Sequence, residues 1–180
     1  EITLTSSLSV DQAEGTLSVQ NLEINALGTQ ILANISGSNI QTAAPTYQTG
    51  FVITGENLAL LFQIAELDEL ATQISSLGSS SFDVSASLEA NTAQGNIRIS
   101  DLDANLLGAN IVGDIVASNI QSETPILTGS LNASGPDLPT LIEVLGQIQS
   151  GRESALSQYG RQLSQVPDKN FSINTEFNAD

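Results

Sequence analysis

The sequence predicts an α+β fold in which antiparallel β-sheet predominates, built from two copies of one unit that together form a curved sheet or groove. Three observations favour this fold. The chain contains an internal repeat, each copy alternates apolar and polar residues over most of its length, and each copy then changes to helical spacing. Short connections favour antiparallel pairing, and we expect about five strands per copy, each copy followed by one or two amphipathic helices.

The repeat is the first of these observations. A shift of 80 residues aligns positions 1–66 with positions 81–146 without a gap, and 18 of the 66 aligned residues are identical. Self-similarity at a fixed period is typical of repeat architectures. We therefore expect repeat 1 over residues 1–80, repeat 2 over 81–169, and the first strand of a truncated third repeat over 170–180.

Alternation of apolar and polar residues places strands in the first part of each copy. Gly15, Gly28, Gly95 and Gly108 separate the alternating segments, and glycine permits the positive φ angles that tight turns need. The expected strands include residues 2–5, 16–20, 31–35 and 51–53 in the first copy and 82–85, 96–99, 111–115 and 131–133 in the second.

Helical spacing follows the strands in both copies. In the first copy, apolar residues three and four positions apart predict a helix over about 57–77, with Asn57 as its N-cap. In the second copy, Asp137 is the expected cap of a helix over about 138–150, and a further helix is expected over about 153–166. Each unit is therefore expected to end in helix.

The composition excludes several classes of function. The 180 residues include 20 acidic and 4 basic residues, giving a net charge of −16, and they include no His or Cys. So negative a chain repels phosphate backbones, which excludes nucleic acid as a partner. Without His or Cys there is no Ser-His-Asp or Cys-His pair and no thiolate metal site. We therefore expect a protein that is not an enzyme and has no catalytic residues and no cofactor.

Acidic clusters are the remaining candidates for a metal site. Asp101 and Asp103 lie on the same side of an expected strand, and Asp114 is expected nearby. Calcium takes six to eight oxygen ligands, but the sequence contains neither an Asp-rich calcium loop nor a glycine-aspartate nonapeptide repeat. We interpret these acids as solvated surface groups and predict no metal site.

A pattern of glycine and aliphatic positions marks the passage from strand to helix and covers most of both copies. It is preceded by residues 107–113, and it contains no catalytic signature. In the second copy it is formed by Pro125, Gly129, Asp137, Leu138, Leu141, Ile142, Leu145 and Gly146, and in the first, more loosely, by Pro45, Gly50, Leu58, Leu61 and Phe62. This pattern resembles that of the AsmA family of bacterial envelope proteins.

The resemblance implies a function in the bacterial envelope. AsmA-family proteins are anchored in the inner membrane, extend through the periplasm, and carry repeated β-rich units in a groove-like sheet with an apolar interior. They are implicated in outer-membrane integrity and in phospholipid movement between the two membranes. The resemblance thus implies a periplasmic segment of an inner-membrane-anchored protein of a Gram-negative bacterium. Its implied partners are phospholipid acyl chains and adjacent repeats of the same parent chain. Because the chain begins at Glu1 inside a strand pattern, we interpret it as a piece of a longer protein.

A groove also receives support from the expected dimensions of the elements. A helix is about 10 Å across and strands are about 4.8 Å apart, so two helices would cover less than half of the expected sheet. A large uncovered apolar face on a soluble protein usually marks a binding surface. The expected lining of this groove is Leu4, Leu17, Val19, Ile31, Ile35, Phe51, Ile53, Val84, Ile97, Ile99, Ile111, Ile115 and Leu131.

A second interpretation fits the same alternation. The strands and helices could enclose sealed cores, because an ordinary sheet core requires the same aliphatic residues as a groove. The protein would then be a structural or adhesive surface repeat protein with an acidic, calcium-tolerant exterior. The two interpretations differ in one structural respect, which is whether the apolar face of the sheet is open or covered.

Overall fold

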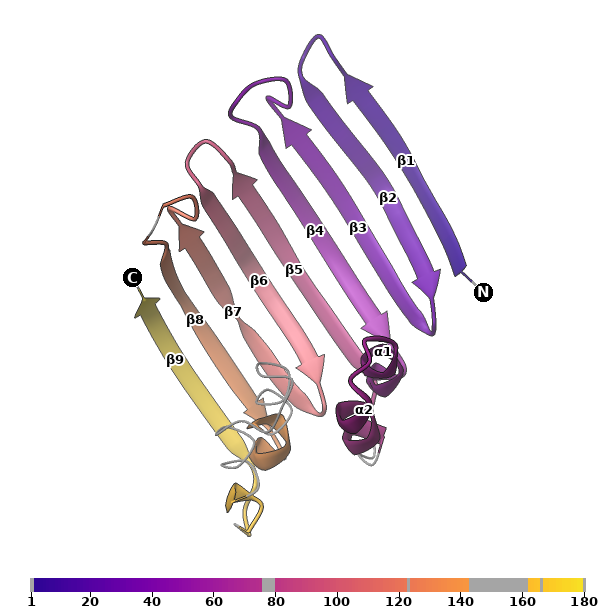
Figure 1. The fold of residues 1–180 in the computed structure, drawn as a ribbon, viewed down its shortest axis with the longest axis vertical. Helices are drawn as coiled ribbons and strands as arrows, with labels where there is room; N and C mark the ends of the chain where they lie inside the picture. The colour runs from indigo at the N-terminus through magenta and orange to yellow at the C-terminus, as the bar shows by residue number, and fades with distance from the viewer. Residues whose placement is uncertain (1, 76–79, 123, 143–161, 166, 180) are drawn as a thin grey trace.

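A computed structural model of the chain describes residues 2–75, 80–122, 124–142, 162–165 and 167–179. Nine antiparallel strands form one curved, open sheet in which each strand pairs with its neighbours in the chain (Figure 1). The strands are β1 (Ile2–Asp11), β2 (Thr16–Ala26), β3 (Thr29–Ser38), β4 (Thr46–Gly55), β5 (Phe82–Asn91), β6 (Asn96–Leu106), β7 (Ala109–Ser118), β8 (Ile126–Gly135) and β9 (Phe171–Ala179).

The predicted antiparallel sheet is confirmed, but the fold is mostly β, and the expected number of about five strands per copy is wrong. Four strands, β1–β4 and then β5–β8, occupy the two copies. Strands β2 and β6 each continue through a bulge, where Asn21 and Asp101 have φ angles of 52° and 53°. At each of these residues the pairing register shifts, so one extra residue interrupts the alternation while the strand continues.

Two short helices replace the single helix expected over 57–77. Helix α1 (Leu58–Ile64) begins where the side chain of Asn57 accepts a hydrogen bond from the N–H of Leu60, at 3.1 Å. It ends before Glu66, whose φ of 60° turns the chain into α2 (Asp68–Ser75). In the second copy, residues 138–142 are helical and the Asp137 carboxylate accepts from the N–H of Thr140, at 3.2 Å. Residues 143–161, where most of the two further expected helices fall, lie outside the described residues.

The helices lie at one end of the strands and do not form a layer over the sheet. Figure 1 shows α1 and α2 beyond the end of β4. Ala59, Ala71 and Ile74 are buried between these two helices, and Leu107, from the β6–β7 turn, packs against them. This small cluster lies at one end of the sheet. No helix in the described part of the chain is both long and apolar enough to cross a membrane.

The strand register separates the side chains into two faces. Residues paired across an antiparallel ladder share a face, so one face can be followed from strand to strand. One row crosses all nine strands and contains only aliphatic residues: Leu4, Ile24, Ile31, Ile53, Val84, Ala104, Ile111, Ala133 and Ile173. We call the surface that contains this row the apolar face, and the opposite surface the polar face.

Candidate apolar binding face

All 13 residues expected to line a groove lie on the apolar face. Leu4, Ile31, Ile53, Val84 and Ile111 belong to the row that crosses the sheet, and the others belong to parallel rows on the same face. A second row runs Leu8, Val19, Ile35, Thr49, Leu88, Ile99, Ile115, Gly129 and Phe177, and a third contains Leu17 and Ile97. Phe51 pairs with Ala33 and Ala86, and Leu131 pairs with Gly113.

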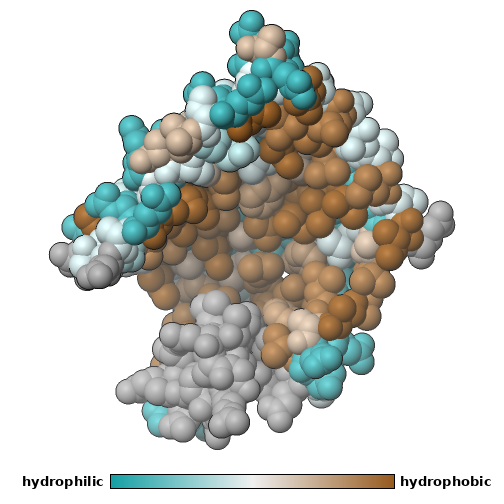
Figure 2. All heavy atoms as spheres, turned by 45° about the horizontal axis from the view of Figure 1, so that its top comes forward, coloured by the Kyte–Doolittle hydropathy of each residue, from teal (hydrophilic) through white to brown (hydrophobic). Residues whose placement is uncertain are grey.

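The apolar face is open over the described part of the chain. Within the sheet, the only buried hydrophobic residues among those described are Phe82, Ala86, Ala104 and Ala109. The large aliphatic residues on the central strands are half-buried by their neighbours in the sheet. Leu4 on β1 is 66% exposed and Ile173 on β9 is 44% exposed. Figure 2 shows hydrophobic side chains gathered in a hollow, with hydrophilic residues around its rim.

The size of this face is large for a solvent-facing apolar surface. Nine strands of about ten residues, at about 4.8 Å between strands and 3.4 Å per residue, give a face of roughly 40 by 34 Å. The largest apolar patch on a typical monomer covers about 300–600 Å² and is often functional. The apolar face therefore exceeds what a soluble protein leaves open without a use for it.

Three aromatic rings on the apolar face lie opposite glycines. Phe82 pairs with Gly55, and a Cβ added at Gly55 would overlap with that ring. On β8, a Cβ at Gly129 would lie 2.7 Å from the Phe177 ring, and one at Gly135 would lie 2.9 Å from the Phe171 ring. Each ring thus occupies the space that a side chain on the neighbouring strand would need.

Sequence reasoning missed part of the apolar face for an identifiable reason. Leu17 and Val19 have odd positions on β2, but Leu22 and Ile24 on the same strand and face have even positions. The extra residue at the bulge changes the parity, so simple alternation assigns Leu22 and Ile24 to the wrong face. The signal available was the recurrence of Leu22 as Leu102, whose strand has the same bulge. Other residues missed on this face are Ile2, Leu8, Val10, Phe82, Leu88, Leu102, Leu106, Leu127, Phe171, Ile173 and Phe177.

The two bulges are completed by side chains from the polar face. The amide oxygen of Asn34 accepts a hydrogen bond from the N–H of Asn21, at 3.0 Å. In the second copy, the carboxylate of Asp114 accepts from the N–H of Asp101, at 3.3 Å. Each acceptor lies opposite its bulge and takes a backbone donor that the ladder leaves unpaired. Asp114 therefore has a structural role at the position where the sequence suggested an acidic cluster.

Several other acids of the polar face bond to neighbouring amides. Asp103 accepts from the side chain of Asn110 at 2.9 Å, and Asp83 accepts from that of Asn105 at 3.0 Å. Glu23 accepts from the side chain of Gln30 at 3.0 Å. Within the described ranges, no three acidic side chains converge on a point where they could hold a metal ion. The polar face thus carries hydrogen-bonded carboxylate and amide groups, beside a few exposed aliphatic side chains such as Leu32 and Val52.

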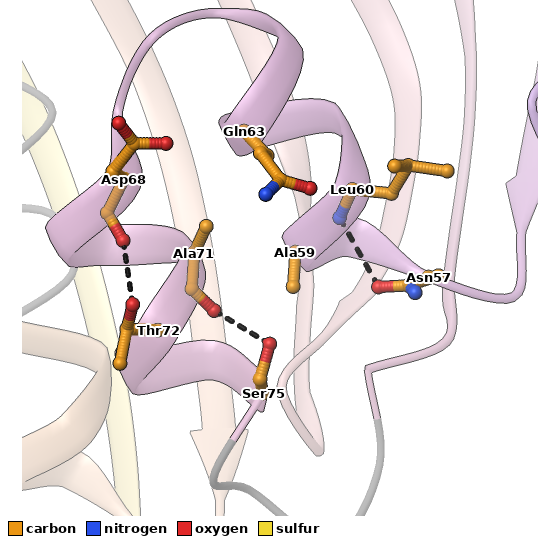
Figure 3. A pocket seen from close by; sticks show the side chains of 8 residues that line it. All are labelled: Asn57, Ala59, Leu60, Gln63, Asp68, Ala71, Thr72 and Ser75. Carbon is orange, nitrogen blue, oxygen red and sulfur yellow. Dashed lines mark hydrogen bonds between the residues drawn. The ribbon is translucent and has the colours of Figure 1, made fainter.

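A cavity of about 360 Å³ lies between α1 and α2, and it is the weaker candidate for a ligand site (Figure 3). Three of the polar side chains that line it already bond within the helices. The Thr72 hydroxyl donates to the carbonyl of Asp68 at 2.9 Å, the Ser75 hydroxyl donates to the carbonyl of Ala71 at 2.8 Å, and Asn57 caps α1. A ligand would have to compete with these hydrogen bonds, so the cavity offers little for recognition.

Comparisons with known proteins leave the family of the chain open. No protein-family model matches it, and neither a curated protein nor a solved structure does. The resemblance to the AsmA family therefore rests on the glycine and aliphatic pattern alone, and the function must be argued from the geometry of the face.

Proposed function

We propose that this chain is a non-catalytic segment that binds the acyl chains of lipids along its apolar face. The observation that carries the proposal is the uninterrupted aliphatic row from Leu4 on β1 to Ile173 on β9, on a face that no layer covers over the described residues. Burying one methylene contributes about 0.8 kcal/mol, so an acyl chain that lies on this row would gain affinity along its whole length.

The chemistry of the apolar face supports an acyl chain as the occupant. An unpaired polar group in an apolar contact costs free energy, so a surface for hydrocarbon requires few hydrogen-bonding side chains. The polar side chains placed on this face by strand pairing and alternation are Ser6, Thr29, Thr49, Thr175 and the Tyr47 hydroxyl, and no charged side chain is among them. Nothing in this arrangement makes or breaks a bond, and the mechanism is passive.

The cellular setting belongs to the same proposal. We infer an AsmA-like envelope protein whose repeats, each with strands followed by helix, form sections of a longer groove. The parent protein would be anchored in the inner membrane, and this segment would conduct phospholipid through the periplasm during outer-membrane assembly. The support is the glycine and aliphatic pattern together with an open, one-sided sheet of the kind such a groove requires.

The decisive experiment compares substitutions at adjacent residues whose side chains lie on opposite faces of the sheet. Delipidated protein is titrated with pyrene-labelled phosphatidylcholine, and the affinity is measured by fluorescence for wild type and for Ile53→Asp and Ile111→Asp. A charge on the apolar face must be desolvated by the acyl chain, so each variant should weaken binding by about tenfold or more. Val52→Asp and Val112→Asp are matched controls on the polar face and should bind like wild type.

Folding has to be checked alongside binding, because Ile53 and Ile111 lie on inner strands. Far-UV circular dichroism and the urea midpoint of each variant show whether the sheet is intact. If the inner variants unfold, Ile173→Asp on the edge strand β9 replaces them, with Ser172→Asp as its control. Wild-type protein that binds no lipid, or apolar-face variants that bind as well as their controls, would refute the proposed function.

A further inference from the structure

The sheet contains the same junction between strands twice. The last strand of each copy, β4 or β8, pairs with the strand that follows the helices, β5 or β9. We call β4 and β8 closing strands, and β1, β5 and β9 opening strands. Gly55 faces Phe82 at the first junction, and Gly135 faces Phe171 at the second. Both ladders continue from these pairs without a shift, so the two junctions have the same register.

One backbone hydrogen bond closes both junctions at the helical end. The N–H of Leu58, at the start of α1, donates to the carbonyl of Ser80 at 2.8 Å. In the second copy the N–H of Leu138 donates to the carbonyl of Lys169 at 3.1 Å. Ser80 and Lys169 each lie two residues before an opening strand. The junction is therefore a repeated structural element, which indicates what strand fits beside a further opening strand.

Strand β1 is an opening strand that has no closing strand beside it in the described part of the chain. The 80-residue repeat places Ile2 at the position of Phe82, and Leu8 at the position of Leu88. Strand β1 is a border of the sheet and pairs only with β2 (Figure 1). Ile2, Leu4 and Leu8 are 74%, 66% and 68% exposed, more than any other large hydrophobic residue described.

The outer edge of β1 lacks the features that protect an edge strand from pairing. Natural edge strands are often short, charged or interrupted by proline or a bulge. Strand β1 has ten residues and no proline, and its one charged residue, Asp11, is its last. Its bulge at Ser6 shifts the register towards β2. Strand β5 has the same bulge towards β6, yet it pairs with β4 over ten residues without a shift. The bulge therefore leaves the outer edge of β1 able to pair.

A backbone donor is also available at the end of β1 remote from the helices. At the first junction the N–H of Thr92 donates to the carbonyl of Pro45, just before β4, at 3.2 Å. Gln12 is the equivalent of Thr92. Its carbonyl accepts from the side chain of Gln41, as that of Thr92 accepts from Gln121. The N–H of Gln12 has no hydrogen-bond partner among the described residues.

The side chains of β1 on the apolar face fit a strand with the pattern of β4. Ser6 is at the position of Ala86, a small residue that faces Phe51. Leu8, like its equivalent on β5, fits opposite a residue of the size of Thr49. A strand that matches β1 therefore has a large apolar residue opposite Ser6 and a smaller one opposite Leu8.

A second copy of the chain does not offer such a strand. The two border strands of the sheet, β1 and β9, are both opening strands. Two copies joined edge to edge would therefore place one opening strand beside another. Both junctions in the structure join an opening strand to a closing strand instead.

We propose that the outer edge of β1 binds the closing strand of a further unit of this repeat, antiparallel and in the register of β4 on β5. In this register the residue equivalent to Ile53 faces Leu4, as Ile53 faces Val84 within the chain. The apolar face then continues past β1 on the same side of the sheet. This inference concerns the edge of the sheet and holds whether or not the face binds lipid.

The test adds the proposed strand to the full chain. Residues 46–55 are fused in front of Glu1 through a flexible linker of about ten Gly and Ser residues, which gives the added strand a millimolar effective concentration. The chain has no Cys, so thiols can be placed singly. Leu4→Cys is combined with Ile53→Cys or with Val52→Cys in the added strand. Dibromobimane, which becomes fluorescent when it joins two thiols, measures which of them lies opposite Leu4.

The cross-linking rates test the register directly. Residues directly opposite each other have Cβ atoms about 4.5–5.5 Å apart, whereas adjacent residues of a strand point to opposite faces. Cross-linking should therefore be about tenfold faster or more with Ile53→Cys than with Val52→Cys in the added strand. Equal rates would mean that the added strand has no fixed register. A faster reaction of Val52→Cys would mean pairing with the other face outward, and either result overturns the proposal.

Hydrogen exchange provides an independent measure in fusions without Cys. The amides of β1 should exchange about tenfold more slowly, or slower still, than in the 180-residue chain. The matched control carries Val52→Pro and Ile53→Pro in the added strand, which removes one N–H on each side of that strand and should restore the original exchange. Circular dichroism shows whether each fusion keeps the sheet. If the chain instead forms dimers through β1 that the added strand does not dissociate, a second copy is the occupant and the proposal is wrong.

Discussion

The two copies of the repeat have the same local structure in different surroundings. The N–H of Ile40 donates to the carbonyl of Gly15 at 3.0 Å, and 80 residues later the N–H of Ile120 donates to the carbonyl of Gly95 at 3.0 Å. The difference between the copies lies at their outer sides. Strand β5 has β4 beside it, whereas the outer edge of β1 pairs with nothing in the described chain, and every residue of β1 is exposed.

This difference teaches that each unit is completed by its neighbour. Phe82 and Ala86 on β5 are buried, whereas the corresponding Ile2 and Ser6 on β1 are exposed. The turn between β6 and β7 likewise sets Leu107 against helices α1 and α2, which belong to the preceding copy. Stability in such an array is the sum of weak units and the interfaces between them. Substitutions at equivalent positions of the two copies measure those interfaces.

The largest effect is expected at the contact between Gly55 and Phe82. Gly55→Val places methyl groups where the Phe82 ring lies, and overpacking of this kind costs about 3 kcal/mol of unfolding free energy. Gly135→Val should cost less, because a Cβ there would lie 2.9 Å from the Phe171 ring on the edge strand β9 and 3.0 Å from the Cα of Ala109, whereas one at Gly55 overlaps with the Phe82 ring. Urea denaturation, monitored by circular dichroism, measures the loss of unfolding free energy in both variants.

The control for these variants lies on the same strand as Gly55. Gly50 faces the opposite side, with nothing within 4 Å of an added Cβ, and valine favours strands, so Gly50→Val should be neutral or slightly stabilising. Equal losses at Gly50 and Gly55 would mean that the cost comes from the backbone and not from the ring.

Ile53 and Val84 show what the sequence could predict, and the turn at Glu66 shows what it could not. Alternation is a local property, so it correctly placed Ile53 and Val84 on one face without knowledge of their neighbours. That these residues remain uncovered depends on where the helices pack, and a sealed core would have had the same alternation. Glu66 interrupts the helical segment and directs α2 beyond the end of the sheet, and the hydrophobic pattern contains no signal for this interruption.

Substitution by asparagine at Leu27 and at Leu107 is expected to change the free energy of unfolding in opposite directions. Both residues occupy the first position of a two-residue turn with φ of 56°, where asparagine is preferred because it tolerates positive φ. Leu27 is 49% exposed, so Leu27→Asn should relieve backbone strain and stabilise the protein by about 1 kcal/mol. Leu107→Asn gains the same relief but loses the packing against α1 and α2, and should destabilise by about 1 kcal/mol.

Thermal or urea unfolding of the two variants tests this comparison directly. The identical residues and φ angles make each variant the control for the other. If both substitutions stabilise the protein, the packing of Leu107 against the helices contributes nothing, and the two copies would not be coupled through this turn.

The smallest effects are expected at the acceptors that complete the two bulges. Asn34→Ala and Asp114→Ala each leave a backbone N–H without its partner, on a surface where water can replace the lost acceptor. Both should therefore cost only about 1 kcal/mol, with the larger loss at Asp114 because hydrogen bonds to a charged acceptor are stronger. Asp114→Asn makes the second copy resemble the first and should be close to neutral. If Asp114→Asn costs as much as Asp114→Ala, the second copy depends on the charge itself, and the two bulges are alike in geometry but are stabilised differently.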